Sequence, residues 1–312
     1  MVVWFLGVLA VLVAAGTAFG IFLGLLQNFH PAFDSFSHFR LHLILVFILC
    51  CAVLFLVPVK KTRIVALLLI ACGAGWLAFE YSKGPAENGA RGDIRLVQFN
   101  LKYRNRIIDQ VGQQLVAYDA DVVLLQEVTR AHEAALRGLS HYPHQQHCFF
   151  PEYVGGVSIL SKHPLSSVDC AKGQGMATAQ VDFPSGAVTV SSIHALWPWP
   201  YNQHGQINRW RQRLQATTGP TIIAGDFNAA PWSHAVSKVE KASNTKVVPG
   251  IRMTIGVKLY SFLPAVPIPI DHTLLSNEFC AISARVGDPL GSDHYPVIFD
   301  IVRVGSVTNQ GC

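Results

Sequence analysis

Three long apolar stretches without any Asp, Glu, Lys or Arg constrain the fold of this chain more than any other feature. They cover residues 1–33, Leu41–Val59 and Ile64–Phe79. A helix needs about 17–25 apolar residues to cross a bilayer, and the third stretch, with 16 residues, comes close to that length. Helices buried in a soluble protein normally keep a polar face. The sequence therefore predicts a membrane anchor over residues 1–79 with about three transmembrane helices.

A cleaved signal peptide is the alternative for the first stretch, but a positive n-region is missing and two more apolar stretches follow. Lys60, Lys61 and Arg63 lie between the second and third stretches, and basic residues near span ends favour the cytoplasm. With three spans, the chain from Glu80 onward then lies outside, although Arg40 in the first loop argues against this orientation. With two spans the orientation reverses. We expect a multi-pass protein of the inner or plasma membrane with a periplasmic or extracellular domain.

Charged residues are concentrated after the anchor. They form only 14% of the whole chain, against about 25% in a typical soluble domain. Residues 80–312 hold 20 of the 24 Lys and Arg and 18 of the 19 Asp and Glu, a net charge of +2. Nucleic-acid binders usually carry a basic excess, so this balance weakens, without excluding, a nucleic-acid substrate.

Beyond the anchor, short apolar runs alternate with amphipathic segments. Residues 80–92 are polar and rich in glycine, as in a linker, and residues 305–312 form a C-terminal tail. Within residues 93–304, we expect strands over 94–99, 121–126, 157–160, 187–193, 221–224, 268–275 and 295–302, and helices over 107–117, 129–139 and 203–216. This alternation predicts an α/β domain. Residues 241–267 show no clear period and are expected to form a long loop facing the substrate.

Two polar side chains end expected strands. Asn100 follows the strand over 94–99, and Glu127 follows the strand over 121–126. A carboxylate in this position suits Mg²⁺, which binds one or two carboxylates together with water and substrate phosphate. An amide beside it can orient a metal-bound water or a phosphate. Singly, each residue is more often an ordinary turn or strand-end residue.

The turn Gly225-Asp226-Phe227-Asn228 follows a buried apolar run. Asp226 and Asn228 are two residues apart, so both face the same side of an extended segment. A carboxylate beside an amide can hold a water and orient it for in-line attack, and Gly225 permits close backbone approach. A simple turn is the alternative, but the strand before it favours a functional site.

Two Asp-His pairs, Asp271-His272 and Asp293-His294, lie near the C-terminus. Neighbours in a strand face opposite sides, so one member of each pair can serve a given pocket. A histidine needs a carboxylate to fix its tautomer before it acts as a base, and we therefore pair His294 with Asp271. Asp293 is left for metal or leaving-group chemistry, and His272 for packing.

His194 ends another expected strand and can donate to a phosphate oxygen, although a lone histidine is more often structural. Trp197 begins an aromatic stretch with Trp199 and Tyr201. This stretch is interpreted in three ways: as a substrate wall, as a rim at the membrane interface, which suits tryptophan, or as a packing corner.

The cysteines show no CxxC spacing, so a structural zinc site is not indicated. A compartment outside the cytoplasm permits a disulfide, for which Cys148–Cys170 is the first candidate. Free buried cysteines are the expected state.

Seven segments in this order resemble the endonuclease/exonuclease/phosphatase superfamily, which includes DNase I, abasic-site endonucleases, neutral sphingomyelinases and inositol polyphosphate 5-phosphatases. They are RLVQFN (95–100), DADVVLLQEV (119–128), GGVSILSKHPL (155–165), SSIHA (191–195), AGDFNAAPW (224–232), IDHTLLS (270–276) and GSDHYPV (291–297). The resemblance implies a membrane-anchored member of bacterial type with a DNase I-like four-layer α/β/β/α sandwich. It also implies one-step hydrolysis by water, without a covalent intermediate.

The same resemblance implies roles for individual residues. Asp226 would orient the attacking water and Asn228 the phosphate. His294 with Asp271 would form the base or phosphate-stabilising pair, and His194 would stabilise the charge that develops on the phosphate.

For the metal, the resemblance implies Glu127 as a ligand with Asn100 beside it, and Asp293 at the metal or the leaving group. Some nucleases of the family carry Asp two residues after the strand-end Asn, where this chain has Lys102. The metal would then depend more on Glu127, and an abasic-site endonuclease is disfavoured. Lys102 and Arg104 instead offer a cluster that binds the substrate phosphate, with a solvated loop as the alternative.

We therefore expect a membrane-anchored phosphodiesterase that depends on Mg²⁺, with Mn²⁺ as an alternative cofactor. Its expected partners are the lipid bilayer and a phosphoester substrate, and no obligate protein partner is inferred. The anchor, the aromatic stretch and the near-neutral charge favour a lipid or other small phosphoester near the membrane. An endonuclease acting on DNA or RNA is the first alternative. A non-catalytic, membrane-tethered binding module is the second, and the complete set of polar residues argues against it.

Overall fold

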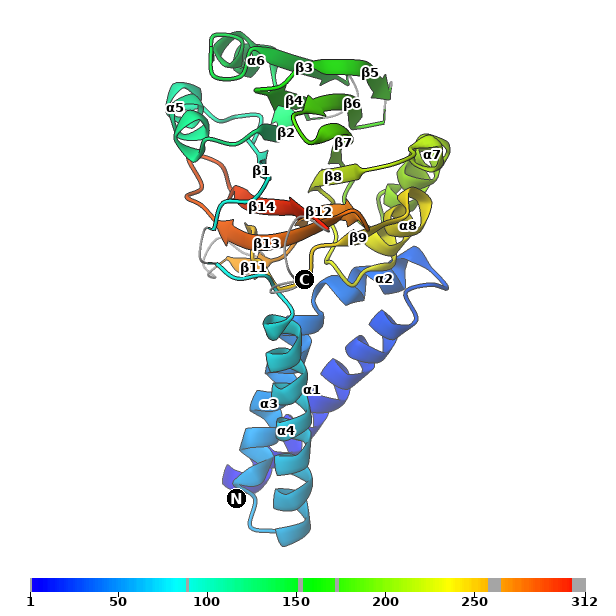
Figure 1. The fold of residues 1–312 in the computed structure, drawn as a ribbon. Helices are drawn as coiled ribbons and strands as arrows, with labels where there is room; N and C mark the ends of the chain where they lie inside the picture. The colour runs from blue at the N-terminus through cyan, green and yellow to red at the C-terminus, as the bar shows by residue number, and fades with distance from the viewer. Residues whose placement is uncertain (1, 88–89, 151–153, 172–173, 258–264, 305–312) are drawn as a thin grey trace.

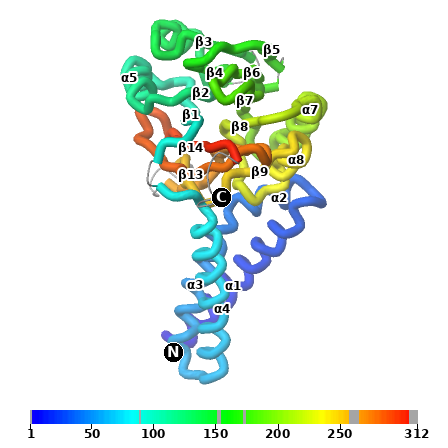
Figure 2. Tube along the Cα trace, viewed as in Figure 1, coloured from blue at the N-terminus to red at the C-terminus, as the bar shows by residue number. Residues whose placement is uncertain are grey.

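The protein consists of a helical N-terminal part and an α/β domain, shown by a computed structural model (Figures 1 and 2). The structure describes residues 2–87, 90–150, 154–171, 174–257 and 265–304. The expected C-terminal tail, 305–312, lies outside the described residues.

The N-terminal part contains four helices: α1 (Val2–Leu25), α2 (Pro31–His38), α3 (Arg40–Phe55) and α4 (Lys60–Ser82). Helices α1 and α4 are each long and apolar enough to cross a membrane, and α2 with α3 passes the same test as one span bent by 61°. The described residues therefore contain two candidate spans, or three if the bent pair counts as one. In Figure 1 the N-terminus and the α3–α4 connection lie at the end farthest from the α/β domain.

Helix α1 packs through small residues. Its buried positions are Gly7, Ala10, Ala14, Thr17, Gly20 and Gly24. A Cβ atom at Gly20 would lie 3.2 Å from Leu43 Cδ1 in α3, and one at Gly24 would lie 3.3 Å from the backbone nitrogen of Ser37 in α2. Small residues of this kind let apolar helices approach closely where there is no hydrophobic driving force between them.

The charge-free stretch 1–33 does not form a single helix. Helix α1 ends at Leu25, and a second helix begins at Pro31 after a turn. Proline is tolerated at the first helical position, where its missing N–H would be unpaired in any case. The side chain of His30 accepts a hydrogen bond from the Ala32 N–H and caps the new helix.

The α/β domain contains two six-stranded sheets. In the order across the first sheet, the strands are β13 (Phe279–Val286), β14 (Val297–Arg303), β1 (Ile94–Asn100), β2 (Val122–Val128), β4 (Gly156–Ser161) and β3 (His144–Phe149). In the second sheet they are β5 (Leu165–Ala171), β6 (Met176–Phe183), β7 (Gly186–His194), β8 (Thr221–Asp226), β12 (Asp271–Ser276) and β9 (Thr245–Val247). The pairs β1/β2 and β7/β8 are parallel.

Three hydrophobic clusters define four layers. Alternate residues of a strand face opposite sides of its sheet, so Leu96 and Leu124 lie in the core between the sheets, whereas Val97 and Leu125 face outward. Helices α5 (Ile108–Tyr118) and α6 (Arg130–Leu136) cover the outer face of the first sheet. Helices α7 (Gln203–Ala216) and α8 (His234–Ser243) cover that of the second. This arrangement confirms the predicted α/β/β/α sandwich.

The expected loop over 241–267 is wrong for part of its length. It contains the end of α8, strand β9, and the two-stranded sheet of β10 (Ile255–Val257) and β11 (Val266–Ile268), while residues 258–264 lie outside the described part. Three-residue strands are too short to give a recognisable alternation. The edge strands β3 and β5 were missed for a different reason: the polar sequence HQQHCF of β3 and the half-exposed β5 give no apolar run.

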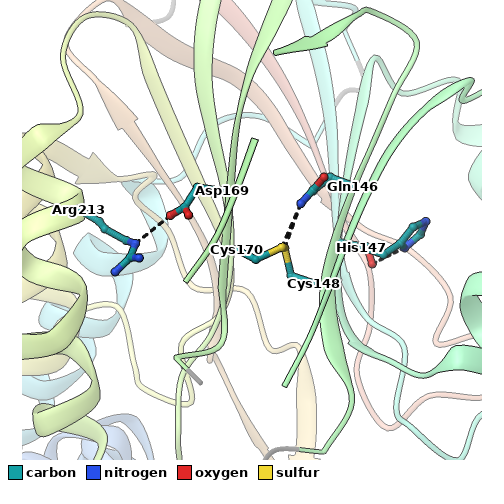
Figure 3. Close-up of a disulfide and its surroundings, with 7 residues drawn as sticks. Gln146, His147, Cys148, Asp169, Cys170 and Arg213 are labelled. Carbon is teal, nitrogen blue, oxygen red and sulfur yellow. Dashed lines mark hydrogen bonds and ion pairs between the residues drawn. A yellow bond between two sulfur atoms is a disulfide. The ribbon is translucent and has the colours of Figure 1, made fainter. Parts of the chain in front are cut away.

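A disulfide joins Cys148 in β3 to Cys170 in β5, with Cα atoms 5.5 Å apart (Figure 3). The expectation of free cysteines is therefore wrong for this pair. Strands β3 and β5 are edge strands of different sheets, and stacking of the sheets brings the two edges together. The side chain of Gln146 donates a hydrogen bond to Cys170 Sγ at 3.0 Å. The remaining cysteines of the anchor, Cys50, Cys51 and Cys72, are free.

Candidate active site

Polar side chains from both sheets meet where the parallel strands end. Asn100 ends β1, beside Gln126 of the parallel strand β2. His194 and Asp226 end β7 and β8 and are neighbours in the parallel register. Asp271 begins β12, which runs antiparallel to β8 and places it opposite Asp226. Ends of parallel neighbours lie at the same sheet edge, so sequence positions more than 100 residues apart converge.

The Asn100 side chain joins the two sheets at this edge. Its Nδ2 donates to Asp226 Oδ2 at 2.9 Å and to Glu127 Oε1 at 3.2 Å. Its Oδ1 accepts from the backbone N–H of Lys102 at 2.9 Å, which fixes the orientation of the amide. The second Glu127 oxygen accepts from the backbone N–H of Tyr103 at 2.9 Å. Asn100 therefore holds the carboxylates of Glu127 and Asp226 close to one another.

Glu127 reaches this edge because the backbone of β2 is irregular there. Its φ is +55°, and the register of β2 with β4 shifts between Gln126 and Val128. Such a bulge redirects one side chain out of the regular alternation. Gly155 makes the approach possible, since a Cβ atom at that position would lie 2.6 Å from the Glu127 carbonyl carbon.

Asn228 is held against Asp226. Its backbone N–H donates to Asp226 Oδ1 at 2.8 Å, and its Nδ2 donates to the carbonyl oxygen of Ala195 at 2.8 Å. Its φ is +46°, a conformation that asparagine tolerates better than most residues. Among the described residues, the buried Oδ1 of Asn228 has no hydrogen-bond partner, so one acceptor remains for a group that enters the site.

The expected pairing of His294 with Asp271 is present. His294 Nδ1 lies 2.9 Å from Asp271 Oδ2. Asp226 Oδ2 lies 3.7 Å from His294 Nε2 and 3.6 Å from His194 Nε2. Both carboxylates and the His294 imidazole are buried.

The electrostatics of this cluster follow from burial and mutual charge. Burial is the main effect that raises the pKa of Asp226 to about 6, with the Asp271 carboxylate adding to it and His294 opposing it. For His294, burial favours the neutral ring, but the Asp271 and Asp226 carboxylates outweigh it and raise its pKa to about 10. The two nearby carboxylates thus favour the charged form of His294, against the effect of burial.

The other predicted residues are more exposed than this cluster. Asp293 Oδ2 is 3.2 Å from Lys102 Nζ, and both side chains are more than a third exposed. The Arg104 guanidinium lies over the Tyr103 ring, 4.9 Å from its centroid. Trp197 follows β7 and is 43% exposed. Metal binding by Asp293 and substrate binding by Lys102, Arg104 and Trp197 stay predictions.

His272 occupies the packing position expected for it. It is buried, its Nε2 lies 2.8 Å from the carbonyl oxygen of Ala229, and its ring lies 5.5 Å from that of Phe227. Burial lowers the pKa of His272 to about 4, so the ring is neutral near pH 7.

Several supporting residues were missed by the sequence analysis. Gln98 Nε2 donates to Asp271 Oδ1 at 2.7 Å and to Gln126 Oε1 at 2.9 Å, and Gln126 Nε2 donates to Ser192 Oγ at 3.0 Å. Ser292 Oγ donates to the Asn100 carbonyl oxygen at 2.8 Å and accepts from the His294 N–H at 3.0 Å. The available signal was a glutamine in each of two mainly apolar strands, since a buried polar residue needs a partner.

The residues present fit a divalent cation that prefers oxygen ligands. Ligand atoms of Asp226, Asp271 and His294 all lie within 4.8 Å of one another. The neighbouring Glu127 and Asp226 offer carboxylate oxygens held by Asn100. Carboxylates and carbonyl oxygens are the ligands chosen by Mg²⁺ and Mn²⁺, and Asn228 Oδ1 adds an unpartnered acceptor. Which of these side chains bind the ion stays a prediction.

Comparison with known proteins gives a consistent result. A family model described as "Endonuclease/Exonuclease/phosphatase family" matches residues 97–294. An inositol phosphosphingolipids phospholipase C of Schizosaccharomyces pombe is 27% identical over 179 residues, which are 45% of this chain and 42% of that protein. The chain thus spans less than half the length of this relative.

Solved structures show the same fold. An endonuclease/exonuclease/phosphatase from Beutenbergia cavernae superimposes with a TM-score of 0.53 at 20% identity, covering 68% of this chain and 72% of that one. Another from Bacteroides vulgatus gives a TM-score of 0.53 at 18% identity, covering 67% and 98%.

Proposed function

The chain belongs to the endonuclease/exonuclease/phosphatase family of hydrolases, and from that premise we propose that it is a membrane-anchored phosphodiesterase dependent on a divalent metal ion. Mg²⁺ is the proposed ion and Mn²⁺ the alternative. One observation carries the proposal: Asn100 and Glu127 of one sheet and Asp226, Asp271 and His294 near the other meet at a single edge. A non-catalytic binding module would have no need to keep this complete set of residues.

In the proposed reaction, water attacks the phosphorus in line with the leaving oxygen. The bound cation, held by Glu127 with Asn100 beside it and Asp293 nearby, would supply positive charge close to the phosphoryl oxygens. Asp226 orients the attacking water, and Asn228 orients the phosphate.

Two histidines complete the proposed site. His294 with Asp271 is expected to form the base or the phosphate-stabilising pair; the raised pKa of His294 favours the second role, because a protonated ring donates to phosphate and cannot act as a base. His194 stabilises the charge that develops on the phosphoryl oxygens. Groups already fixed by hydrogen bonds, as His294 is by Asp271, need little reorganisation during the reaction, which makes such electrostatic stabilisation effective.

The proposed substrate is a lipid or another small phosphodiester at the membrane surface. Two or three candidate spans precede the domain, and the similar S. pombe protein is named for its action on phosphosphingolipids. Trp197, Trp199 and Tyr201 form an exposed aromatic stretch after β7, a composition suited to the interface of a bilayer. Lys102 and Arg104 are proposed to bind the phosphate.

We propose further that the domain faces the periplasm or the cell exterior. The Cys148–Cys170 disulfide supports this orientation, since disulfides persist mainly in oxidising compartments. A phosphatase reporter that works only outside the cytoplasm should be active when fused to the C-terminus of the full chain. A fluorescent reporter that works only in the cytoplasm should give no signal at the same position. A C-terminal reporter active only in the cytoplasm would refute the orientation.

The activity is best tested on the full chain in detergent micelles with Mg²⁺. The substrates are sphingomyelin in mixed micelles, bis(p-nitrophenyl) phosphate and plasmid DNA. Asp226→Ala and His294→Ala are expected to lower kcat by about 10²–10³-fold, the usual loss when one preorganised catalytic group is removed. Asp109→Ala, an exposed carboxylate in α5, is the matched control and should be unchanged.

The pattern of activity separates the alternatives. Hydrolysis of the lipid and the small diester, abolished by both site variants, supports the proposal. Preferential cleavage of DNA would identify an endonuclease instead. A folded wild-type protein inert towards all three substrates would favour a binding module, and full activity in Asp226→Ala would overturn the site.

A further inference from the structure

Helix α2 lies between two candidate spans but packs against the α/β domain, where Figure 1 shows it below α8. Trp232 Nε1 donates to the Ser37 carbonyl oxygen at 2.7 Å, and Gln27 Nε2, just before α2, donates to the Trp232 carbonyl oxygen at 3.1 Å. Phe39, just after α2, packs on the cluster of Ile255, Ile268 and Ile270. The anchor therefore contacts the domain on a specific surface beside β12, the strand that begins with Asp271.

A buried carboxylate fixes α2 to helix α8. Asp34 is 0% exposed, and its oxygens accept from the backbone N–H groups of His234 at 2.9 Å and Ala235 at 3.0 Å. His204 Nε2 of α7 lies 3.0 Å from the same carboxylate, and Ser37 Oγ donates to it at 3.0 Å. A negative charge is favourable at a helix N-terminus, and a buried charge is tolerated only when it is paired in this way.

A second contact reaches the chain close to the active site. The backbone N–H of Ala230 donates to Nδ1 of the buried His38 at 3.3 Å. Ala230 is two residues after Asn228, and the Ala229 carbonyl oxygen between them is bonded to His272. A backbone donor requires an unprotonated Nδ1, so His38 acts here as a fixed acceptor.

Together these contacts hold one continuous segment, residues 226–235. Its first part carries Asp226 and Asn228, and the backbone N–H groups of its last part donate to the Asp34 carboxylate. Trp76 of α4 and Arg40 of α3 pack on the Trp232 ring. Among the described residues, the hydrogen bonds that hold residues 230–235 from outside the α/β domain come from α2 and its flanks. Displacement of α2 would leave that part of the segment without these partners.

We infer that α2 is a positioning element of the active site, and that Asp34 and His38 hold residues 226–235 so that Asp226 and Asn228 keep their catalytic geometry. The inference rests on the proposed function of these two residues. It makes the anchor part of the catalytic unit in addition to its attachment to the membrane. Small displacements of positioned groups lower kcat, by up to about 10²-fold for 1 Å, even where the displaced residue touches no substrate.

A pair of substitutions at His38 tests this inference in the full chain. His38→Asn retains a side-chain oxygen near the position of Nδ1 and can accept from the Ala230 N–H, whereas His38→Leu fills similar space without an acceptor. With bis(p-nitrophenyl) phosphate and Mg²⁺ in detergent micelles, we expect His38→Leu to lower kcat about tenfold with little change in KM, and His38→Asn to stay within about twofold of wild type. Ser35→Ala, at an exposed 3.4 Å contact of the same helix with the Trp199 carbonyl oxygen, is the control and should be unchanged.

The result separates this inference from the proposed function. If wild type is inactive, the proposed function fails. If wild type is active and Asp226→Ala is inactive, equal kcat values for His38→Leu and His38→Asn, whether normal or reduced, overturn the positioning role. Should His38→Leu not fold, Asp34→Asn replaces it, because it keeps one acceptor for the α8 N–H groups but removes the charge. An unchanged kcat in that variant also overturns the inference.

Discussion

The two sheets are joined by a covalent bond at one edge and by buried hydrogen bonds at another. The Cys148–Cys170 disulfide links the edge strands β3 and β5. At the active-site edge, Asn100 donates to Asp226 across the sheets and Gln98 donates to Asp271. The disulfide constrains the chain whatever is bound, whereas the hydrogen bonds orient side chains that must meet a substrate.

The difference separates stability from activity within one sandwich. A disulfide acts largely by restricting the unfolded chain, so its effect does not depend on the chemistry at the far edge. A buried polar network contributes less net stability, because each group gives up water to enter the protein. What it provides is orientation. We therefore expect changes at the disulfide to alter stability without altering catalysis, and changes at the polar edge to alter catalysis in addition to stability.

The largest expected effect on stability comes from the double change Cys148→Ser and Cys170→Ser. The disulfide closes a sequence separation of 22 residues, and removing such a loop constraint lowers the free energy of unfolding by about 3 kcal/mol. Chemical denaturation of the full chain in detergent measures this loss. The kcat of the folded variant should equal that of wild type, and a large loss of kcat would contradict the separation.

Removal of the metal ion should lower the free energy of unfolding, because the ion binds the folded chain at the active-site edge. The disulfide edge should not contribute to this change. A ligand that binds the folded state at 100 times its Kd stabilises it by about 2.7 kcal/mol. We expect Mg²⁺ to raise the unfolding midpoint of wild type and a chelator to reverse the change.

One variant at each edge tests where the ion acts. Glu127→Ala should lose most of the Mg²⁺-induced shift, whereas the serine variant of the disulfide should keep it in full. A shift that survives in Glu127→Ala would place the ion elsewhere.

A smaller effect is expected from Gln98→Leu. This change removes the donor to the buried Asp271 carboxylate, and an unsatisfied buried acceptor lowers stability by about 1–3 kcal/mol. We expect kcat to fall about tenfold as well, since Asp271 loses part of its support for His294.

Gln145→Leu is the control for that change near the disulfide edge. Gln145 in β3 donates to the Leu136 and Tyr142 carbonyl oxygens at 2.8 and 2.9 Å. Its replacement should lower stability without lowering kcat. Equal losses of kcat in the two glutamine variants would break the comparison.

The smallest predicted effect is on stability in acid. Burial lowers the pKa of His147, beside the disulfide, to about 4, against 6.5 in the unfolded chain. Between these values the unfolded state binds more protons, so stability falls as pH falls from 6.5 towards 4. At pH 5, His147→Gln should recover on the order of 1 kcal/mol relative to wild type, a value reduced by the partial exposure of the ring. An identical pH dependence of unfolding in both proteins would refute this assignment.

The sequence by itself determined the local structure and the chemistry available. Short apolar runs located β1, β2 and β8, and the polar residues at or near their ends, Asn100, Glu127 and Asp226, were recognisable as strand-end groups. The charge-free stretches predicted the long N-terminal helices. These features depend on which residues of a short segment enter the apolar interior and which stay in water. That pattern repeats every 2 residues in a strand and every 3.6 residues in a helix, so it can be recognised in the sequence.

Only the tertiary structure decided which of these groups meet. The disulfide required two edge strands to lie against each other. Gln98 supports Asp271 only because β1 and β12 pack together. Asp34 of α2 accepts a hydrogen bond from the backbone of His234, 200 residues away. A β-bulge, which no local pattern indicated, turned Glu127 towards Asp226. Contacts of this kind depend on how distant segments pack, because hydrogen bonds act over a few ångströms and no local period in the sequence encodes which remote segment will come within that range.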